Sequence, residues 1–575
     1  EEAVDMTINI PIALLRIGHN ALGAIHPMRI GIYWHAIDWE RVHRIVRNLQ
    51  GRIVKAVQAK RVRIRKSLQR LLTHSTSAKL LAIRRVTENK GGRSAGIDKE
   101  IWNSPKRKWQ ALSKLKTKGY TAQAVRQVKI PKKNGKWRKL GIPTMKDRAM
   151  QALYLMALEP ISETFADGHS YGFRPYRSCA DAISQCHIVL CRATSPQWIL
   201  EADIKGCFDH INHEWLLQNI PLPKNILQTW LKSGIINQKQ QYEPTQEGTP
   251  QGAIISPTLA NMTLDGLQTE LYKKMGITYH KNGMVRHNPH QINYIRYADD
   301  FIVTANNPIV LIEQVKPFIT AFLKKRGLEL SEEKTHLTHI QQGFDFLGKN
   351  IRKYGKTLLT RPSKKSVKTF LKNIKTIIRS YPSLNAATLI QLLNPKIKGW
   401  AMYYRSDASK ETFYKVDHWI WQKIWRGCLR KHPKKGKRWV RKKYYTTHRN
   451  DQWTFFDYDE NGNMVYLMKM GKVAIKRHTK IRSAANPYDA KDETYFEQRI
   501  QKQLLQKQQG KRLFRQIYNR QKGRCPKCKQ LINNTSGWNI HHVTPVHLGG
   551  KTTMDNLVML HPVCHQQIHY APKFS

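Results

Sequence analysis

The sequence predicts a multidomain α+β protein, and three observations support this fold class. With 575 residues the chain is longer than a single domain usually is, so several domains with their own cores are expected. Helical patterns fill residues 34–90 and 361–452, whereas the region between them mixes helices with short apolar strands. Cysteines and histidines concentrate in residues 520–575, which predicts a small metal-binding domain there.

The net charge indicates an extended polyanion as partner. The chain has 99 Lys and Arg residues against 40 Asp and Glu residues, a formal net charge of +59, which is more than solubility requires. Because this charge is spread along the chain, the polyanion is expected to be an extended one such as a nucleic acid. A basic protein of the membrane surface is the alternative, but the basic stretches lack a long apolar face.

No membrane partner is expected, because no stretch reaches the roughly 18 apolar residues that a membrane span needs. Residues 8–32 come closest, but polar and basic residues interrupt them, and they lack the Ser and Arg richness of a transit peptide. Residues 1–33 are therefore treated as an extension of unknown role. The eight cysteines favour a reducing cytoplasm over a disulfide framework.

Residues 34–90 are expected to form basic amphipathic helices. Apolar residues such as Val42 and Val46 recur there at three-and-four spacing, as in a helix with one buried face. Arginines and lysines occupy the other face, which suits RNA. Three of these cations are RNA-binding candidates: Arg44, Arg47 and Lys55.

The strongest catalytic signal is the pair Asp299 and Asp300, which follows Tyr297-Ala298 between two apolar stretches. Two adjacent carboxylates at the bend of an apolar hairpin are costly unless a cation neutralises them. Nucleotidyl transfer needs such carboxylates to hold two divalent ions against a primer hydroxyl and a triphosphate. An ordinary hairpin with Asp at its turn is the alternative. Asp203, which ends an apolar run, supplies a second acidic site and favours the catalytic interpretation.

Further motifs surround these carboxylates in an order typical of one family. An expected hairpin with an Asn134-Gly135 turn precedes them. The other motifs are, in chain order, residues 171–175 (YGFRP), 248–252 (GTPQG), 327–331 (GLELS) with Lys334-Thr335, and 343–348 (GFDFLG). Together they resemble the motifs of reverse transcriptases, whose fingers and palm would occupy residues 91–360 of this chain.

This resemblance implies roles for individual residues. Asp203 and Asp299 would hold two Mg²⁺ ions, with Asp300 beside them in a lesser role. Phe208 matches the aromatic gate that crowds a 2′-hydroxyl and so favours deoxynucleotides. A second glycine usually follows the GTPQG motif, and the methyl group of Ala253 would affect rate or fidelity rather than the class of activity. The residues assigned to the template and the incoming dNTP are Lys129, Arg138, Gln251 and Gly252.

Residues 361–452 are expected to form an α-helical thumb. Lysines recur there at helical spacing, including Lys364 and Lys368, which are further RNA-binding candidates. Aromatic residues such as Trp400 and Trp421 alternate with cations, which suits RNA, although the same aromatics would also suit the core of the thumb. The block resembles the thumb or X domain of group II intron maturases. Residues 453–519 are assigned, mainly by position, to the DNA-binding region of that family.

The last region carries two pairs of metal ligands at close spacing. Cys525 and Cys528 form one pair, and His561 and Cys564 form the other, which together predict a structural Zn²⁺ site. Two unrelated pairs of buried Cys and His are the alternative. Members of the family often have Cys at position 561, so His561 is the ligand that departs from the pattern.

The histidines around this site resemble those of HNH nucleases, which have a ββα-metal fold. Adjacent His541 and His542 on a strand point in different directions, which suits a ligand beside a general base. His565 and His569 share one helix face. The resemblance implies that His541, His565 and His569 hold one catalytic divalent ion, that His542 activates water, and that Asn556 fixes the turn and orients the base. His547 is expected to be a structural loop residue.

A right-hand polymerase with a thumb/X domain, a DNA-binding region and an HNH zinc domain is the arrangement of group II intron-encoded proteins. The chain resembles these proteins over residues 34–569. The resemblance implies an RNA-directed DNA polymerase and an HNH DNA endonuclease. The resemblance implies that the protein binds group II intron RNA and aids its splicing. It further implies retrohoming, in which the HNH domain nicks a target DNA and the polymerase extends the nicked end with dNTPs.

Other functions and locations remain open at this stage. One alternative is a splicing maturase with little polymerase activity, against which the intact Asp203, Asp299 and Asp300 argue. Another is a reverse transcriptase of a defence system, against which the X-like and HNH regions argue. The bacterial cytoplasm is the favoured location, with an organelle as the alternative.

Overall fold

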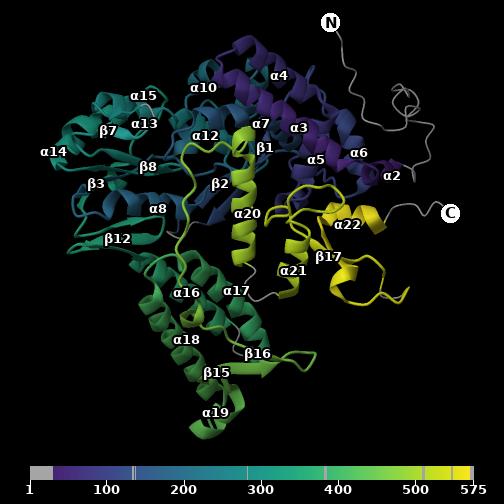
Figure 1. Cartoon of the computed structure of the whole chain (residues 1–575), viewed down its shortest axis with the longest axis vertical. Coiled ribbons are helices and arrows are strands. Elements are labelled where there is room, and N and C mark those ends of the chain that lie inside the picture. The colour runs from purple at the N-terminus through teal and green to yellow at the C-terminus, as the bar shows by residue number, and fades with distance from the viewer. Residues whose placement is uncertain are drawn as a thin grey trace.

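The computed structural model of the protein describes residues 30–131, 135, 137–280, 283–380, 385–507, 512–545 and 548–569. Within them, helical regions flank mixed regions of helices and short sheets (Figure 1). Three expectations fall at least partly outside the described residues. They are the extension of residues 1–33 up to residue 29, the Asn134 half of the hairpin turn, and His547.

Three helices near the start of the described chain pack on one another and on a long central helix. They are α3 (Trp39–Gln58), α4 (Val62–His74) and α5 (Thr76–Thr87), and the central helix is α7 (Met145–Phe165). The Asp38 side chain caps α3 by accepting a hydrogen bond from the Arg41 backbone N–H at 3.1 Å. The apolar face of α3 is buried, as its periodicity predicts.

The palm is a four-stranded antiparallel sheet in the order β10-β3-β9-β8. Its strands are β3 (Trp198–Asp203), β8 (Asn293–Tyr297), β9 (Asp300–Ala305) and β10 (His336–His339). Most residues of β3 and β9 are buried, and burial does not alternate from one residue to the next. This is because helices such as α8 (Cys179–Leu190) pack against the sheet. Asp203 is paired with Asp300 in the β3–β9 register, so both acidic sites lie at the same end of the sheet.

The fingers contain the hairpin expected from the sequence. It pairs β1 (Val125–Pro131) with β2 (Trp137–Ile142) in antiparallel register, with Ile130 opposite Arg138. Two short strands extend this sheet in the order β2-β1-β4-β5, namely β4 (Ile235–Ile236) and β5 (Tyr242–Glu243).

The thumb follows a second antiparallel sheet and projects away from the palm (Figure 1). The strands of this sheet are β11 (Phe344–Phe346), β12 (Lys349–Tyr354) and β13 (Thr357–Pro362). The thumb helices are α16 (Lys364–Ser380), α17 (Ala386–Tyr404), α18 (Lys410–Lys431) and α19 (Lys437–Tyr444). The predicted α-helical thumb is therefore present.

Another antiparallel sheet packs on the thumb helices. It contains residues from both sides of the domain boundary that the sequence suggested. Its strands are β14 (Tyr445–His448), β15 (Asp451–Tyr458) and β16 (Met464–Tyr466). Apolar residues of the sheet share one core with α16, α17 and α18. The boundary expected between residues 452 and 453 falls inside this sheet, because strand pairing across it joins the two segments.

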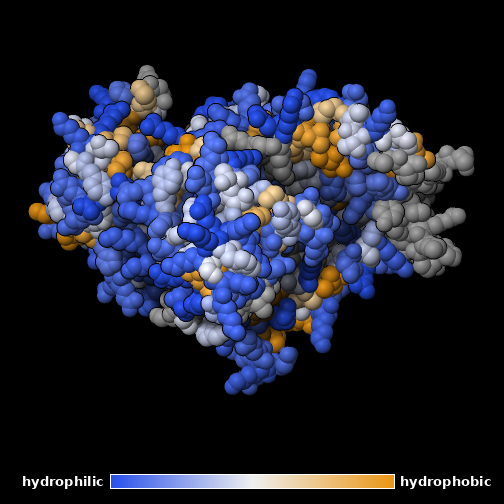
Figure 2. Space-filling model, turned by 90° about the horizontal axis from the view of Figure 1, so that it is seen from below, coloured by the Kyte–Doolittle hydropathy of each residue, from blue (hydrophilic) through white to orange (hydrophobic). Residues whose placement is uncertain are grey.

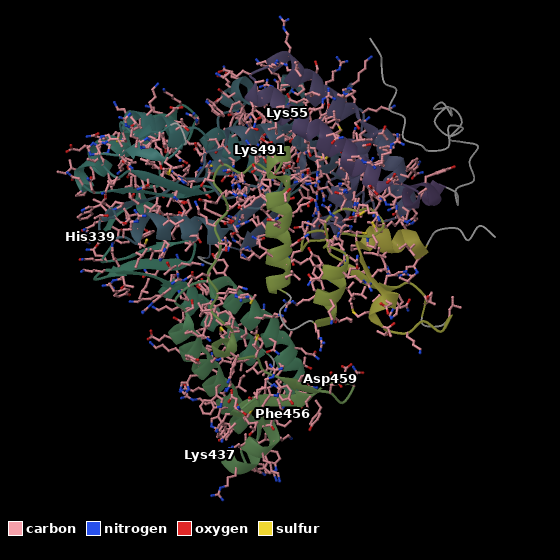
Figure 3. The ribbon with its side chains drawn as sticks, in the orientation of Figure 1. Lys55, His339, Lys437, Phe456, Asp459 and Lys491 are labelled. Carbon is pink, nitrogen blue, oxygen red and sulfur yellow. The ribbon has the colours of Figure 1, made fainter. Side chains whose placement is uncertain are left out.

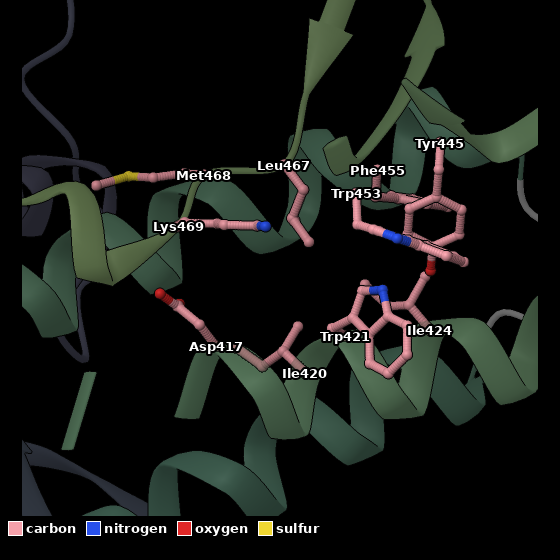
Figure 4. Close-up of a pocket in the computed structure, with 10 residues that line it drawn as sticks. All are labelled: Asp417, Ile420, Trp421, Ile424, Tyr445, Trp453, Phe455, Leu467, Met468 and Lys469. Carbon is pink, nitrogen blue, oxygen red and sulfur yellow. The ribbon is translucent and has the colours of Figure 1, made fainter. Parts of the chain in front are cut away.

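A small cavity of about 20 Å³ lies between α18 and this sheet (Figure 4). Trp421 and Tyr445 line it, and neither the Trp421 indole N–H nor the Tyr445 hydroxyl has a hydrogen-bond partner among the described residues. A volume of this size accommodates about one water molecule. Trp400 and Trp421 both pack against the thumb core, in agreement with the expectation that these aromatics would suit that core.

The chain then returns from the thumb to the palm and ends in a ββα unit. The return passes through α20 (Glu493–Lys507) and α21 (Arg512–Arg520). The ββα unit consists of β17 (Asn539–His542), β18 (Leu557–Leu560) and α22 (Pro562–His569). It lies beside the N-terminal helices (Figure 1), and the Gln567 side chain donates a hydrogen bond to the Ile37 carbonyl at 3.0 Å.

The visible surface is predominantly hydrophilic and carries only separate apolar patches (Figure 2). In the part of the chain that the structure describes, no helix is both long and apolar enough to cross a membrane.

Candidate active sites

Three carboxylates meet at one end of the palm sheet. Asp203 ends β3, Asp300 begins β9, and these two residues are direct strand partners. Ala298 has a left-handed φ of 59°, which closes the hairpin tightly and leaves Asp299 between β8 and β9. The Ile204 backbone N–H donates to the Asp299 carbonyl at 3.2 Å and ties the hairpin to the end of β3. The structure thus brings together the acidic residues that the sequence singled out.

The surroundings of Asp299 and Asp300 oppose the ionisation of these two carboxyl groups. Burial, together with the charge of Asp203, raises the pKa of Asp299. Burial and the charges of Asp203 and Asp299 raise the pKa of Asp300 to about 7. Lys334 forms a hydrogen-bonded ion pair with Asp203, and this contact raises the pKa of Lys334. Such a cluster favours a bound cation, because the cation would stabilise the ionised carboxylates.

A buried network supports the hairpin from behind. A Cβ atom on residue 172 would lie 2.2 Å from the Ala298 nitrogen, so the close approach requires glycine at this position. Asn261 Nδ2 donates to the Gly172 carbonyl at 2.8 Å, and the fully buried Arg296 donates to Asn261 Oδ1 at 3.1 Å. Arg296 also pairs with Asp265 at 2.5 Å.

Sequence reasoning did not identify Asn261, Asp265 or Arg296 as supports of the site. The signal for Arg296 was present, because it is a single charge inside the apolar stretch that leads to the hairpin. Its partners lie about 30 residues upstream along the chain, so the sequence alone did not reveal them.

Phe208 follows the acidic end of β3 in the chain. It lies in the short helix α9 (Cys207–His210), which begins four residues after Asp203. Its ring meets that of Phe173 edge to face, with centroids 5.9 Å apart. Phe173 is 52% exposed and has a left-handed φ of 58°, which marks a side chain that the surrounding fold holds in place. Ala253 is buried, so its methyl group faces protein.

The loop around Gln251 connects the palm to the fingers. The Gly141 backbone N–H, on β2, donates to the Gln251 carbonyl at 2.7 Å. Gly252 has a φ of 107° and packs so closely that a Cβ atom would lie 2.9 Å from the Gly141 carbonyl oxygen. Lys129 and Arg138 are both exposed on the fingers hairpin, and the charge of Arg138 acts on Asp299. Arg138 therefore lies close to the palm carboxylates.

The four predicted zinc ligands form one buried cluster. Ligand atoms of Cys525, Cys528, His561 and Cys564 all lie within 4.8 Å of one another, and Cys528 Sγ lies 3.2 Å from His561 Nδ1. Hydrogen bonds from Cys528 and Cys564 hold the pKa of the Cys525 thiol well below its usual range. Three thiols and one imidazole at this spacing match the donor set of a structural zinc site.

A second cluster joins the three histidines that the sequence assigned to a catalytic ion. Ligand atoms of His541, on β17, and of His565 and His569, on α22, also lie within 4.8 Å of one another. Burial of His541, and its proximity to the other two rings, lowers its pKa. The neutral imidazole that this favours is the form that binds metals.

His542 ends β17, and Asn556 lies directly before β18. His542 Nε2 is 3.2 Å from the Thr552 hydroxyl, and His542 is not part of the three-histidine cluster. The Asn556 side chain accepts from the Thr544 backbone N–H at 2.6 Å and donates to the Lys551 carbonyl at 2.9 Å. Asn556 therefore fixes the loop that follows β17, and none of these hydrogen bonds reaches His542.

The RNA-binding candidates are spread over the molecule. Lys55, Lys364 and Lys368 are exposed, and Arg44 is exposed while paired with Glu40 at 3.6 Å. Arg47 is also exposed on the expected basic face, and it forms an ion pair with Glu493 of α20 at 2.5 Å. Figure 3 shows Lys55 near the upper end of the molecule and Lys437 at the tip of the thumb, so positive charge extends along its length.

Family models match four successive parts of the chain. In chain order they describe an N-terminal domain of reverse transcriptase (residues 34–115), a reverse transcriptase (RNA-dependent DNA polymerase, 130–351), a group II intron maturase-specific domain (367–445) and an HNH endonuclease (525–571). The fold and the two sites thus define a reverse transcriptase joined to a maturase-specific domain and an HNH domain.

Curated relatives agree with these matches. The group II intron-encoded protein LtrA of Lactococcus lactis subsp. cremoris is 30% identical over 356 residues, which cover 52% of this chain and 59% of that protein. Protein YkfC of Escherichia coli K12 is 32% identical over 258 residues, which cover 40% of this chain and 68% of YkfC. The chain belongs to the family of group II intron-encoded proteins, although it spans only about 59% of the length of LtrA.

Among solved structures, apo telomerase from Candida tropicalis matches with a TM-score of 0.34 and 16% sequence identity. The match covers 54% of this chain and 62% of that chain.

Proposed function

We propose that the protein is an RNA-directed DNA polymerase and maturase that binds a group II intron RNA, aids its splicing and supports its insertion into DNA. In this function the HNH domain nicks a target DNA, and the polymerase extends the nicked end with dNTPs along the RNA template. The observation that carries the proposal is the meeting of Asp203, Asp299 and Asp300 in a chain that also holds the three-histidine cluster.

The palm residues have separate tasks in this proposal. Asp203 and Asp299 fit two Mg²⁺ ions, which would orient the primer hydroxyl and the triphosphate and neutralise developing charge. Arg138 and Lys129 neutralise phosphates from the fingers side. Phe208, buttressed by Phe173, blocks the space of a 2′-hydroxyl. Gln251 and Gly252 shape the contact between fingers and palm where the incoming nucleotide would lie.

The C-terminal residues divide into a structural and a catalytic set. The cluster of Cys525, Cys528, His561 and Cys564 suits Zn²⁺, which would hold the small domain together. His541, His565 and His569 would hold one divalent ion at the nicking site. His542 accepts a proton from the attacking water, and its hydrogen bond with Thr552 orients the ring.

The remaining cations contact nucleic acid in this proposal. Lys55, Arg44 and Arg47 on α3 and Lys364 and Lys368 on α16 bind phosphates of the intron RNA. Residues 453–519 contribute to binding of the target DNA. Relatives in Lactococcus lactis and Escherichia coli support a bacterial host, and in such a host the protein works in the cytoplasm with its RNA.

Primer extension on an RNA template tests the polymerase assignment. Asp299→Ala removes a metal-holding carboxylate, so extension should fall by several orders of magnitude, while RNA binding in a gel-shift assay stays unchanged. Glu313→Ala, which removes an exposed carboxylate from the segment Leu311–Val315, is the matched control and should extend normally. Extension by Asp299→Ala at the rate of the parent protein would show that the palm assignment is wrong.

A further inference from the structure

A buried histidine joins the loop of the GTPQG motif to the segment that carries Phe208. His213 begins α10 (His213–Asn219), the next helix in the chain after α9. Its ring nitrogen Nε2 lies 2.7 Å from the Gly248 carbonyl oxygen, and the residue is only 8% exposed. Because a carbonyl oxygen can only accept, Nε2 carries the proton and donates this hydrogen bond.

The backbone of the loop is bonded to the same segment at two further points. The Thr249 N–H donates to the Phe208 carbonyl at 2.7 Å, and the Gly248 N–H donates to the Ile211 carbonyl at 2.8 Å. The main chain of the expected gate residue is therefore attached directly to the loop that the sequence assigned to the incoming nucleotide.

The loop approaches α9 closely at this point. Gly248 has a left-handed φ of 78°, and a Cβ atom there would lie 2.5 Å from the Asp209 carbonyl oxygen. Thr249 is 5% exposed, and its hydroxyl has no hydrogen-bond partner among the described residues. The Thr249 side chain therefore does not fasten the loop to α9, and the His213 ring does.

The other end of the loop is attached to different elements. The Gln251 carbonyl accepts from the Gly141 N–H of the fingers at 2.7 Å, and the Ile254 N–H donates to Gln151 Oε1 of α7 at 3.0 Å. These contacts hold the end of the loop away from α9, whereas His213 holds its start. Loss of the His213 hydrogen bond should thus loosen the start of the loop and leave the rest in place.

The side chain and the main chain of Phe208 are held by different partners. Its ring contacts the Phe173 ring edge to face, with centroids 5.9 Å apart. Its carbonyl is held by the Thr249 N–H, next to the carbonyl that accepts from His213. The position of the Phe208 ring relative to the loop therefore depends on the contacts at residues 248 and 249.

We infer that His213 is a positioning residue for sugar discrimination, which holds the start of the GTPQG loop against α9 so that the Phe208 ring excludes a 2′-hydroxyl. The inference rests on the proposed polymerase function and on the role of Phe208 as its gate. Because His213 is buried, it acts through the Gly248 carbonyl and not on the nucleotide itself.

Primer extension with dNTP and rNTP as separate substrates tests the inference. His213→Leu keeps much of the buried volume but has no donor, so the ratio of kcat/KM for dNTP to that for rNTP should fall about tenfold. His213→Gln is the matched control, because its amide N–H can donate to the Gly248 carbonyl and should preserve most of the ratio. Glu247→Gln, which alters only the exposed contact of Glu247 with His210, should keep the full ratio.

Melting temperatures of the same samples separate positioning from general stability. A purely structural histidine would lower the melting temperature and slow extension with both substrates alike, so the ratio would not change. If His213→Leu does not fold, His213→Met, which also lacks a donor and adapts more easily to its surroundings, replaces it with the same expectation.

A double-mutant cycle shows whether the effect passes through the gate. Phe208→Val removes the ring, so adding His213→Leu to it should cause no further loss of discrimination. An unchanged ratio in His213→Leu, or an equal loss in both backgrounds, would overturn the inference while the polymerase assignment stands. Full discrimination by Phe208→Val would overturn the inference together with the role of Phe208. A parent protein that extends no primer would instead overturn the proposed function itself.

Discussion

At the scale of single residues, Asp300 shows how neighbouring charges control a catalytic carboxylate. It faces Asp203 directly across the β3–β9 pair and follows Asp299 in the chain. Burial is the largest cause that raises its pKa to about 7, and the two carboxylates add to it. Lys334 offsets only part of this repulsion, because its ion pair is with Asp203. The ionised cluster therefore costs stability until a cation binds.

Asp300→Asn should stabilise the protein in buffer without Mg²⁺, and the gain should depend on pH. The ordinary pKa of 3.8 applies to the unfolded chain, and the folded protein binds this proton more tightly, with a pKa of about 7. Stability contributed by the protonated group is therefore lost as pH rises from about 4 to about 7, and the loss is constant above that range. Melting temperatures between pH 5 and pH 8 measure the effect. A gain for the variant that shrinks as pH rises would contradict this prediction.

At the scale of helices and strands, the sequence predicted the features that depend on patterns among neighbouring residues. The apolar period of α3 lies within one helix, so it could be read from neighbouring residues. The acidic ends of β3 and β9 were also predicted, because carboxylates inside apolar runs are conspicuous. The same holds for the spacing of Cys525 with Cys528, which the structure places in one cluster with His561 and Cys564.

Elements fixed by distant partners could not be predicted. The sheet of β14, β15 and β16 joins the thumb because its apolar face completes the thumb core, and no local pattern encodes that contact. The hydrogen bond from Tyr403 to Leu347 spans 56 residues. The ion pair of Arg47 with Glu493 spans 446 residues and covers part of a face that the sequence suggested was free.

Gly172→Ala should impair polymerisation through the hairpin of β8 and β9. The added methyl group would lie 2.2 Å from the Ala298 nitrogen, so the hairpin must shift and carry Asp299 with it. Primer extension should fall by about a hundredfold, as misplacement of a catalytic group does. Gly427→Ala is the matched control, since a methyl group there meets no atom within 4 Å and α18 should gain about 0.5–1 kcal/mol. Equal activity of both variants would separate Gly172 from the support of the site.

At the scale of the whole molecule, the segment between the thumb and the ββα unit is anchored to helix α8 beside the palm sheet. The side chain of Asp181, on α8, is fully buried and accepts hydrogen bonds from Arg499 at 2.7 Å, His478 at 2.8 Å and the Ile481 backbone N–H at 2.8 Å. These contacts neutralise a charge that burial alone would make costly. Some cations of the expected DNA-binding region thus serve the fold instead of a ligand.

This anchoring places the ββα unit beside the N-terminal helices, where it shares a continuous apolar core with them. The two active sites are therefore held in a defined relation, although each is built from its own residues. In the proposed function, polymerisation depends on the palm sheet, and nicking depends on the histidine cluster. Loss of one activity should leave the chemistry of the other intact.

Cys528→Ser and His542→Ala should separate the two metal sites of the ββα unit. Cys528 belongs to the buried zinc cluster, so its loss should unfold residues 520–575, because a bound structural metal supplies much of the stability of so small a unit. His542 lies outside both clusters, so His542→Ala should keep the fold and the full metal content while DNA nicking is lost.

Metal content, nicking and primer extension measured on the same purified samples distinguish these outcomes. Both variants should extend an added primer on an RNA template, because the palm carboxylates are intact, whereas insertion that depends on a nick made by the protein itself should fail in both. If His542→Ala loses the ion of the three-histidine cluster, the residue is a ligand and the assignment of the adjacent His541 and His542 must be exchanged. If it nicks DNA as well as the parent protein, another group accepts the proton of the attacking water, and His542 only orients the loop through Thr552.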